Sequence, residues 1–240
     1  MTILITGGAS GLGEAITRKL ATQSNHTILF TYNHSIDKAK QIEQDYPNTK
    51  AIHCDFLNPD SIGSLLEYIE NSSIDILINN AFATAIHAQH FHKIPVTTFT
   101  GNFLSNIIPT ILITQKAIAQ FRKNKFGKII TVLSSAIIDT PPVGWSEYTA
   151  EKAYLASMSK SWATENSAFN ISANAISPAF MLTDLTKDTD ERMVESITNA
   201  HPLKKILATD EVADAVSFLT NCSQQINGTN MIINAGAHVI

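Results

Sequence analysis

The chain has 240 residues, of which 44% are hydrophobic, and its formal net charge is −4 at pH 7. This length and composition fit one α/β domain with a substantial core. The weak negative charge argues against attraction to nucleic acid or to an acidic membrane surface, and no apolar run of about 18 residues predicts a transmembrane helix. Cys54 and Cys222 are the only cysteines, and no signal peptide is apparent, so we expect a cytoplasmic protein without disulfides.

Short β-branched runs alternate with longer helical stretches along the chain. We expect strands at 2–6, 26–32, 50–54, 74–79, 127–134, 171–177 and 230–234. We expect helices from about 11 to 22, from 36, at 58–70, at 97–123, at 146–168 and at 209–220. Asn58 can cap the third helix and Pro59 can occupy its first turn.

This alternation predicts an α/β fold with a doubly wound, seven-stranded parallel sheet and helices on both faces. Crossover connections in such sheets are right-handed. No repeat or low-complexity linker divides the sequence, so residues 1–240 are expected to form a single domain. The least regular segments, 82–96 and 179–207, both follow strands, which places them at the carboxyl edge of the sheet, where ligands bind in such folds.

A glycine cluster, TGGASGLG, joins the first strand to the first helix at residues 6–13. Glycines allow a tight turn and a close approach of a diphosphate, and the free amides at the helix start attract the anion. The spacing Gly7-x3-Gly11-x-Gly13 differs from the G-x-G-x-x-G dinucleotide fingerprint. An ordinary glycine-rich turn is therefore the alternative interpretation.

Tyr148 and Lys152 lie four residues apart, so they share a face at the start of a predicted helix. A nearby ammonium favours the phenolate and should lower the tyrosine pKa from its reference value of about 10. Tyr148 would then serve as a general acid or base. Ser134 and Ser135 end the fifth predicted strand, where a hydroxyl can hold a substrate carbonyl or, alternatively, cap a turn.

Further segments follow in a characteristic order. They are Asp55 after the third strand, Asn79-Asn80-Ala81-Phe82 after the fourth, Asn106 in the long helix, Pro178-Ala179 followed by Thr183, and INGTNMIINAG at 226–236. With Thr6–Gly13, Ser135 and Tyr148-x3-Lys152, this series resembles the short-chain dehydrogenase/reductase family nearly end to end. That family consists of single-domain Rossmann-fold oxidoreductases that use a nicotinamide cofactor.

The resemblance implies a role for each catalytic residue. Tyr148 would donate a proton to a carbonyl oxygen that Ser135, thirteen residues earlier, holds in place. Lys152 would lower the tyrosine pKa and bind the nicotinamide ribose, and Asn106 would support a water chain that reprotonates Tyr148 through Lys152. Asn102, one helical turn earlier, competes with Asn106 for this assignment. Cofactor contacts are implied for Gly7, Ser10, Gly11, Leu12, Gly13, Asn33, His34, Asp55, Phe56, Asn80, Ala81, Tyr148, Lys152, Pro178, Met181 and Thr183.

Three positions depart from the family pattern. Phe82 replaces a glycine that normally lets the backbone approach the cofactor, and its ring would either line the active-site mouth or turn into the neighbouring loop. Ala179 replaces another glycine, and Asn234 stands where an acidic residue is common. A non-catalytic, cofactor-sensing or scaffold protein on the same fold is therefore the alternative to an enzyme.

The end of the second strand bears on the choice of nicotinamide. Members that prefer NAD carry a carboxylate there to bind the ribose hydroxyls, but this chain has Tyr32, Asn33, His34 and Ser35. Without a carboxylate to repel a 2′-phosphate, NADP(H) is favoured, although no arginine is nearby and NAD(H) is the alternative. The substrate is expected to be a small carbonyl or alcohol compound, with a 3-oxoacyl thioester as the leading candidate and a sugar or secondary alcohol as alternatives.

Two remaining segments suggest other features. His87, His90 and His92 could indicate a metal, but no carboxylate or cysteine lies at ligand spacing, so we expect no metal site. Residues 186–205 mix charged and apolar residues and are expected to form a helical lid, and Trp145 is expected to line the substrate pocket. Family resemblance implies a homo-oligomer, a tetramer or a dimer, assembled through the helices at 97–123 and 146–168.

Overall fold

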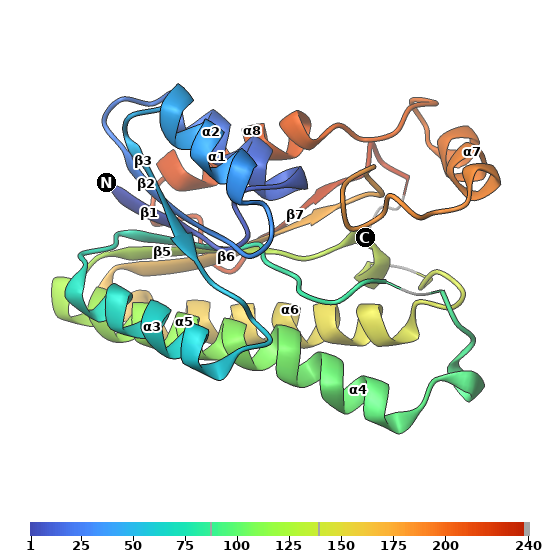
Figure 1. Cartoon of the computed structure of the whole chain (residues 1–240), viewed down its shortest axis with the longest axis horizontal. Helices are drawn as coiled ribbons and strands as arrows, with labels where there is room; N and C mark the ends of the chain where they lie inside the picture. Colours follow the sequence, from blue (N-terminus) through green and yellow to red (C-terminus); the bar gives the residue numbers. More distant parts are fainter. Residues whose placement is uncertain (87, 139, 238–240) are drawn as a thin grey trace.

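A seven-stranded parallel β-sheet forms the centre of the computed structural model, which describes residues 1–86, 88–138 and 140–237 (Figure 1). The strands lie in the order β3-β2-β1-β4-β5-β6-β7, and each neighbouring pair is parallel. They are β1 (Thr2–Ile5), β2 (Thr27–Tyr32), β3 (Thr49–His53), β4 (Ile76–Asn79), β5 (Gly127–Val132), β6 (Ile171–Pro178) and β7 (Asn230–Ile233). The predicted doubly wound sheet is therefore confirmed.

The helices connect these strands and cover both faces of the sheet. They are α1 (Gly11–Ala21), α2 (Ile36–Asp45), α3 (Pro59–Asn71), α4 (Val96–Asn102), α5 (Ile108–Asn124), α6 (Ser146–Asn166), α7 (Glu191–Ala200) and α8 (Thr209–Asn221). As predicted, Asn58 caps α3: its side chain accepts hydrogen bonds from the amides of Asp60 and Ser61 at 2.9 and 3.4 Å, and Pro59 is the first helical residue.

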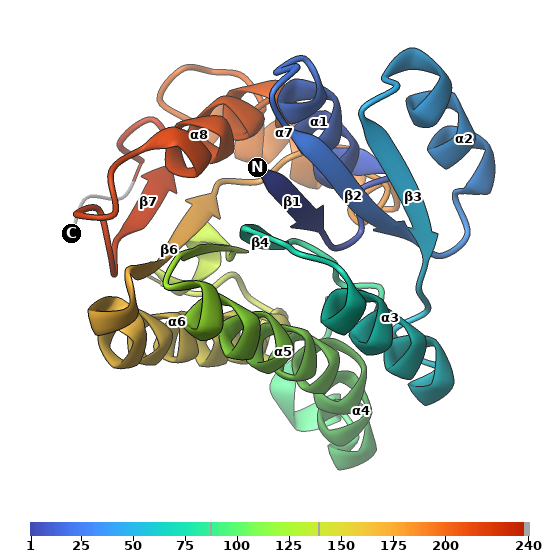
Figure 2. The same ribbon diagram turned by 90° about the vertical axis from the view of Figure 1, so that its left-hand side faces the viewer.

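Two apolar layers hold the helices against the sheet. Figure 2 shows α1, α2 and α8 on one face, and α3, α5 and α6 on the other. Successive strand residues point to opposite faces, so Ile3 and Ile5 of β1 pack with Leu20 of α1, whereas Leu4 packs with Ile113 of α5. Because both faces are covered, the central strands are buried runs of aliphatic residues rather than alternating apolar and polar ones.

The helical rod at 96–124 consists of α4, a π-helical turn at Phe103–Ile107 and α5. Within the described residues it is the one helix long and apolar enough to cross a membrane by length and composition, with a hydropathy of 1.3, whereas the sequence predicted no such segment. In the structure, Ile113, Ala117 and Phe121 of α5 are buried in the layer beneath the sheet. The hydropathy of α5 therefore reflects, at least in part, its packing in the core.

The order of the strands determines where a ligand can enter. After β3 the chain crosses to the other side of β1 and forms β4, so the connections from β1 and β4 diverge at their carboxyl ends and leave a crevice. The segment after β6 extends beyond these ends and carries α7 (Figure 1). Only residues 191–200 of the expected lid at 186–205 are α-helical, and Asp190 caps them by accepting a hydrogen bond from the Arg192 amide at 2.9 Å.

Candidate active site

A cleft of about 860 Å³ opens at the carboxyl ends of the strands, a size typical of small-molecule and cofactor sites. The predicted site residues that line it are Gly7, Ser10, Gly11, Leu12, Gly13, Asn33, His34, Phe56, Asn80, Ala81, Ser135, Tyr148, Lys152, Pro178, Met181 and Thr183. The other two predicted residues, Asp55 and Asn106, are not part of this lining. The topology thus brings together motifs from all parts of the chain.

The glycine loop between β1 and α1 forms a cradle of backbone. Gly7 and Gly11 have φ angles of +66° and +52°, in the left-handed region that favours glycine. A Cβ atom at Gly13 would lie 1.9 Å from the Gly7 carbonyl oxygen, so no side chain fits there. The loop delivers the amide-rich start of α1 to the cleft. This geometry fits the diphosphate of a dinucleotide.

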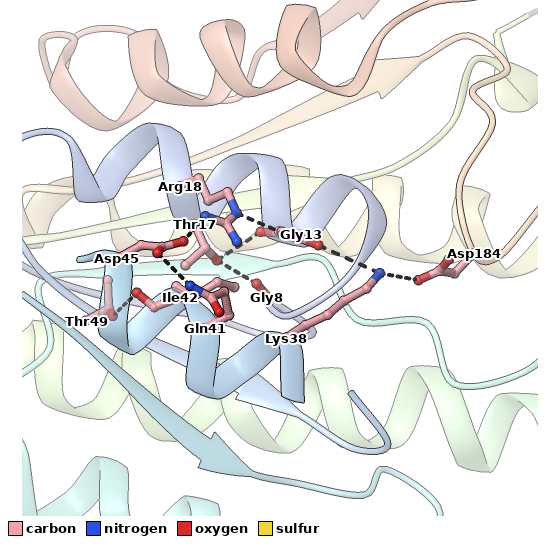
Figure 3. Close-up of polar contacts among 11 residues, drawn as sticks. Gly8, Gly13, Thr17, Arg18, Lys38, Gln41, Ile42, Asp45, Thr49 and Asp184 are labelled. Carbon is pink, nitrogen blue, oxygen red and sulfur yellow. Dashed lines mark hydrogen bonds and ion pairs between the residues drawn. The ribbon is translucent and has the colours of Figure 1, made fainter. Parts of the chain in front are cut away.

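Side chains from three other elements hold this loop in place. The Thr17 hydroxyl of α1 donates to the carbonyls of Gly8 and Gly13, both at 2.9 Å (Figure 3). Thr31 Oγ1 of β2 accepts from the Gly7 amide at 2.8 Å. Asn80 Nδ2, after β4, donates to the Thr6 and Gly7 carbonyls at 3.0 and 3.1 Å. The loop is therefore shaped before any ligand binds.

Polar contacts also organise the end of the cleft beside β2. Asn33 Nδ2 donates to Asp55 Oδ1 at 3.2 Å, which links two of the residues predicted to contact the cofactor. Lys38 of α2 pairs with Asp184, after β6, at 3.3 Å and lies 3.8 Å from Glu14 of α1 (Figure 3). This pair joins α2 to the segment after β6 at the edge of the cleft.

Tyr148 and Lys152 enter the cleft from the first turns of α6, as predicted. Lys152 is buried, and its Nζ donates to the Val132 carbonyl at 3.0 Å. Burial lowers the pKa of Lys152 to about 8, and the neighbouring Glu151 charge opposes that change.

The pKa of Tyr148 moves in the opposite direction from the one expected. Burial raises it, a hydrogen bond with Ser134 lowers it, and the Glu151 charge raises it further. Desolvation disfavours the phenolate more than the protein stabilises it. The phenol therefore keeps its proton at neutral pH, which is the state of a proton donor.

Ser134, one residue before the predicted Ser135, is the serine whose side chain lowers the pKa of the Tyr148 phenol. Its hydroxyl also accepts from the Ala136 amide at 3.2 Å, which fixes its direction just after β5. Ser135 lines the same cleft and begins a short 3-10 turn. Both serines therefore lie in the cleft, and the role of Ser135 in holding a substrate carbonyl stays a prediction.

Phe82 lines the cleft and does not merely turn into the neighbouring loop. Its ring meets the Tyr148 ring edge-on, with centroids 5.4 Å apart, and Lys152 Nζ lies 5.0 Å from its centroid. Trp145 contacts Tyr148 in the same manner at 5.6 Å. Two aromatic rings thus flank the phenol, and one of them covers the ammonium of Lys152.

Asn106 lies in the π-helical turn, behind the cleft, and is buried. Its Oδ1 accepts from the Ala83 amide at 2.8 Å, and its Nδ2 donates to Thr84 Oγ1 at 2.8 Å and to Glu151 Oε2 at 3.0 Å. The competing residue, Asn102, donates instead to Glu147.

Sequence reasoning missed Glu151. The signal that could have found it is its position three residues after Tyr148 on the same helix, next to Lys152. Its contact with Asn106 depends on how α6 packs beside the π-helical turn.

The histidine segment gives no sign of a metal centre. His90 and His92 stack with ring centroids 6.0 Å apart, and His87 lies outside the described residues. Among the residues described, no group of three histidine, cysteine or acidic side chains could hold a metal ion.

Comparison with known proteins gives the family. The family described as enoyl-(acyl carrier protein) reductase matches residues 7–238. The 3-oxoacyl-[acyl-carrier-protein] reductase of Aquifex aeolicus is 30% identical over 241 residues, covering 97% of this chain and 95% of that protein. The 2-dehydro-3-deoxy-D-gluconate 5-dehydrogenase of Bacillus subtilis is 30% identical over 240 residues, covering 98% of this chain and 93% of that protein.

The fold is shared with solved structures. The 3-ketoacyl-(acyl-carrier-protein) reductase from Brucella melitensis, solved with NADH, superposes with a TM-score of 0.88 at 22% identity, covering 99% of this chain and 98% of that one. The chain therefore belongs to the short-chain dehydrogenase/reductase family. It is a nicotinamide-dependent oxidoreductase that acts on carbonyl or alcohol groups.

Proposed function

We propose that this protein reduces a ketone with NADPH and that its substrates are 3-oxoacyl thioesters. The observation that carries the proposal is the meeting of a protonated phenol, a serine hydroxyl and a buried ammonium in one cleft, beside a backbone cradle for a diphosphate. Relatives of this size carry out the same class of reaction, and one of them is named for 3-oxoacyl thioesters.

Each polar residue of the cleft has a separate role in the proposed reaction. Bound NADPH supplies a hydride to the carbonyl carbon. Ser134 donates a hydrogen bond to the carbonyl oxygen, and Tyr148 transfers its phenolic proton to the same oxygen, which completes the alcohol. Lys152, fixed by the Val132 carbonyl, presents a positive charge that favours the phenolate left on Tyr148. Gly7, Gly11 and Gly13 would hold the diphosphate of the bound cofactor, and Asn80 fixes the loop by its hydrogen bond to the Gly7 carbonyl.

The preference for NADPH over NADH is part of the proposal. No carboxylate follows β2, where Asn33, His34 and Ser35 line the cleft and offer hydrogen-bond donors to a 2′-phosphate. Lys38 lies close by, within 3.3 Å of the cleft-lining Asp184. Fluorescence titration with each reduced cofactor tests this preference, and tighter binding of NADH would contradict it.

The substrate end of the cleft supports an uncharged ketone. It carries apolar and aromatic side chains, among them Phe82, Ile86, Trp145, Met193 and Ile197. Of the described residues that line the cleft, Lys152 is the only lysine or arginine, so a sugar acid would lack a permanent positive charge to bind its carboxylate. A sugar or secondary alcohol is the second candidate, since a gluconate-type dehydrogenase is equally similar in sequence.

The proposal also covers the oligomeric state of the protein and its cellular compartment. We expect a cytoplasmic dimer or tetramer, and exposed apolar side chains along the rod at 96–124, such as Val96 and Leu104 at 77% and 63% exposure, support an interface there. Light scattering of the purified protein measures its mass in solution, and a monomer would refute this part.

The test of function is NADPH consumption by the purified protein against a panel of ketones that includes an acetoacetyl thioester. Tyr148→Phe should lose about 10²-fold or more of the turnover and keep its affinity for NADPH. If only other ketones are turned over, they replace the thioester as the proposed substrate. NADPH binding without any turnover would favour a cofactor sensor in which Phe82 blocks Lys152, and Phe82→Gly would then be the next variant.

A further inference from the structure

Glu151 is a buried carboxyl group for which the reaction above has no use. It lies on α6 between Tyr148 and Lys152 and is only 6% exposed. Its Oε2 accepts from Asn106 Nδ2 at 3.0 Å, whereas its Oε1 is buried without a hydrogen-bond partner among the described residues. An unpartnered buried carboxyl oxygen is costly, so this oxygen is suited to take a hydrogen bond from a small polar molecule.

A small cavity of about 10 Å³ lies beside this carboxyl group. Its walls include Tyr148 and Glu151 together with the polar side chains of Thr84, Asn102 and Glu147. A cavity of roughly this volume holds a single water molecule when polar groups surround it. A water there would lie between two residues, Tyr148 and Glu151, that both line the cavity.

Burial and neighbouring groups together set the pKa of the Glu151 carboxyl group. Burial raises its pKa to about 7; the Asn106 hydrogen bond lowers it, the Glu147 charge raises it, and the Lys152 charge lowers it. Tyr148, on the same helix, senses the Glu151 charge in turn. A group with a pKa near the working pH is best suited to accept and release protons.

A second route for protons can work beside Lys152, whose ammonium already makes two contacts. Its Nζ is engaged by the Val132 carbonyl, and the Phe82 ring covers it at 5.0 Å. The glycine that Phe82 replaces would leave that side of the ammonium open.

We propose that Glu151 is a proton-relay residue that reprotonates Tyr148 through one water molecule in this cavity. The inference rests on the proposed reductase function and deepens it. After Tyr148 has given its proton to the carbonyl oxygen, the water protonates the phenolate and takes a proton from the Glu151 carboxyl group. Solvent then restores the Glu151 proton past Glu147, which is half-buried and held by Asn102. Glu151 acts through water and Tyr148, so it is a positioning residue and not a catalytic one.

The first test is the pH profile of kcat for ketone reduction at saturating NADPH. Glu151→Gln keeps the size of the side chain and can still accept from Asn106, but its amide has no titratable proton to pass on. We expect kcat at pH 7 to fall about tenfold, as for loss of a relay step, and the ionisation near pH 7 to vanish, with KM within about twofold. Glu165→Gln, an exposed position on the same helix, is the matched control and should leave the profile unchanged.

A second readout does not depend on activity. In protein labelled with carbon-13 in its glutamate carboxyl groups, the resonance missing from Glu151→Gln should titrate near pH 7 without any cofactor. Titration near the ordinary value of 4.5 would overturn the relay. If the wild type reduces a ketone and Glu151→Gln has the same pH profile of kcat, the relay is overturned but the proposed function is not. If the wild type reduces no ketone, the proposed function and the relay are both overturned.

Discussion

The glycine loop and the start of α6 face each other across one cleft, yet they satisfy their polar groups very differently. Around the loop, Thr17, Thr31 and Asn80 provide hydrogen bonds to the backbone of residues 6–13. At the start of α6, Ser146 Oγ, Thr149 Oγ1 and Glu151 Oε1 are buried and find no hydrogen-bond partner in the part of the chain that the structure describes. A loop binds its ligand more tightly when its conformation is fixed in advance. Proton transfer instead needs side chains that are free to exchange protons.

The largest expected effect comes from breaking the shaped loop. Gly13→Ala places a Cβ atom 1.9 Å from the Gly7 carbonyl oxygen, so the loop must move. We expect a loss of unfolding free energy of about 1–3 kcal/mol and a fall in NADPH affinity of at least about tenfold. Thermal unfolding and fluorescence titration measure the two effects.

Gly63→Ala is the matched control for this change. Gly63 lies in α3, and a Cβ atom there meets nothing within 4 Å. Alanine is the better helix former, so the free energy of unfolding of this variant should rise by about 0.5–1 kcal/mol. Its affinity for NADPH should equal that of the wild type. Equal behaviour of the two variants would refute the argument from the Gly13 contact.

An intermediate effect should separate the two serines after β5. Ser134→Ala removes the hydroxyl that lowers the Tyr148 pKa and that the proposed reaction places on the carbonyl oxygen, so kcat should fall about 10²-fold, as for one lost oxyanion-type donor. Ser135→Ala should lower kcat by less than about threefold. Steady-state kinetics on the two single variants decides the assignment, and the reverse order would return the role to Ser135.

The smallest effect is on stability and follows from the buried carboxyl group at the start of α6. The pKa of Glu151 is about 7 in the folded protein against an ordinary 4.5, so the folded state binds more protons than the unfolded state between these values. Stability conferred by this group is therefore present at low pH and lost as the pH rises through 7. Glu151→Gln should raise Tm by a few degrees at about pH 8 and not at pH 4.5.

The same series of Tm measurements contains its own check. The exposed Glu165→Gln on α6 should track the wild type at every pH. If the Glu151→Gln and wild-type curves of Tm against pH run parallel, Glu151 titrates alike in the folded and unfolded states, and the contrast between the two regions is wrong.

Most of the fold could be predicted because its signals are local. Alternation of β-branched runs with helical segments predicts parallel strands, and Asn58 followed by Pro59 predicts the start of α3, which the structure confirms. The long rod was also anticipated within a few residues, but its π-helical turn was not, because such a turn leaves no simple periodic signal.

The sequence by itself determined the doubly wound sheet, the glycine cradle and the presence of Tyr148 and Lys152 in one cleft, because strand–helix alternation and spacing along a helix are short-range patterns. Only the tertiary structure decided where the Phe82 ring lies and that Asn106 bonds to Glu151, 45 residues away. It also reversed the expected direction of the Tyr148 pKa. These features depend on burial and on packing between distant elements, and desolvation cannot be assessed until the chain has folded around the group.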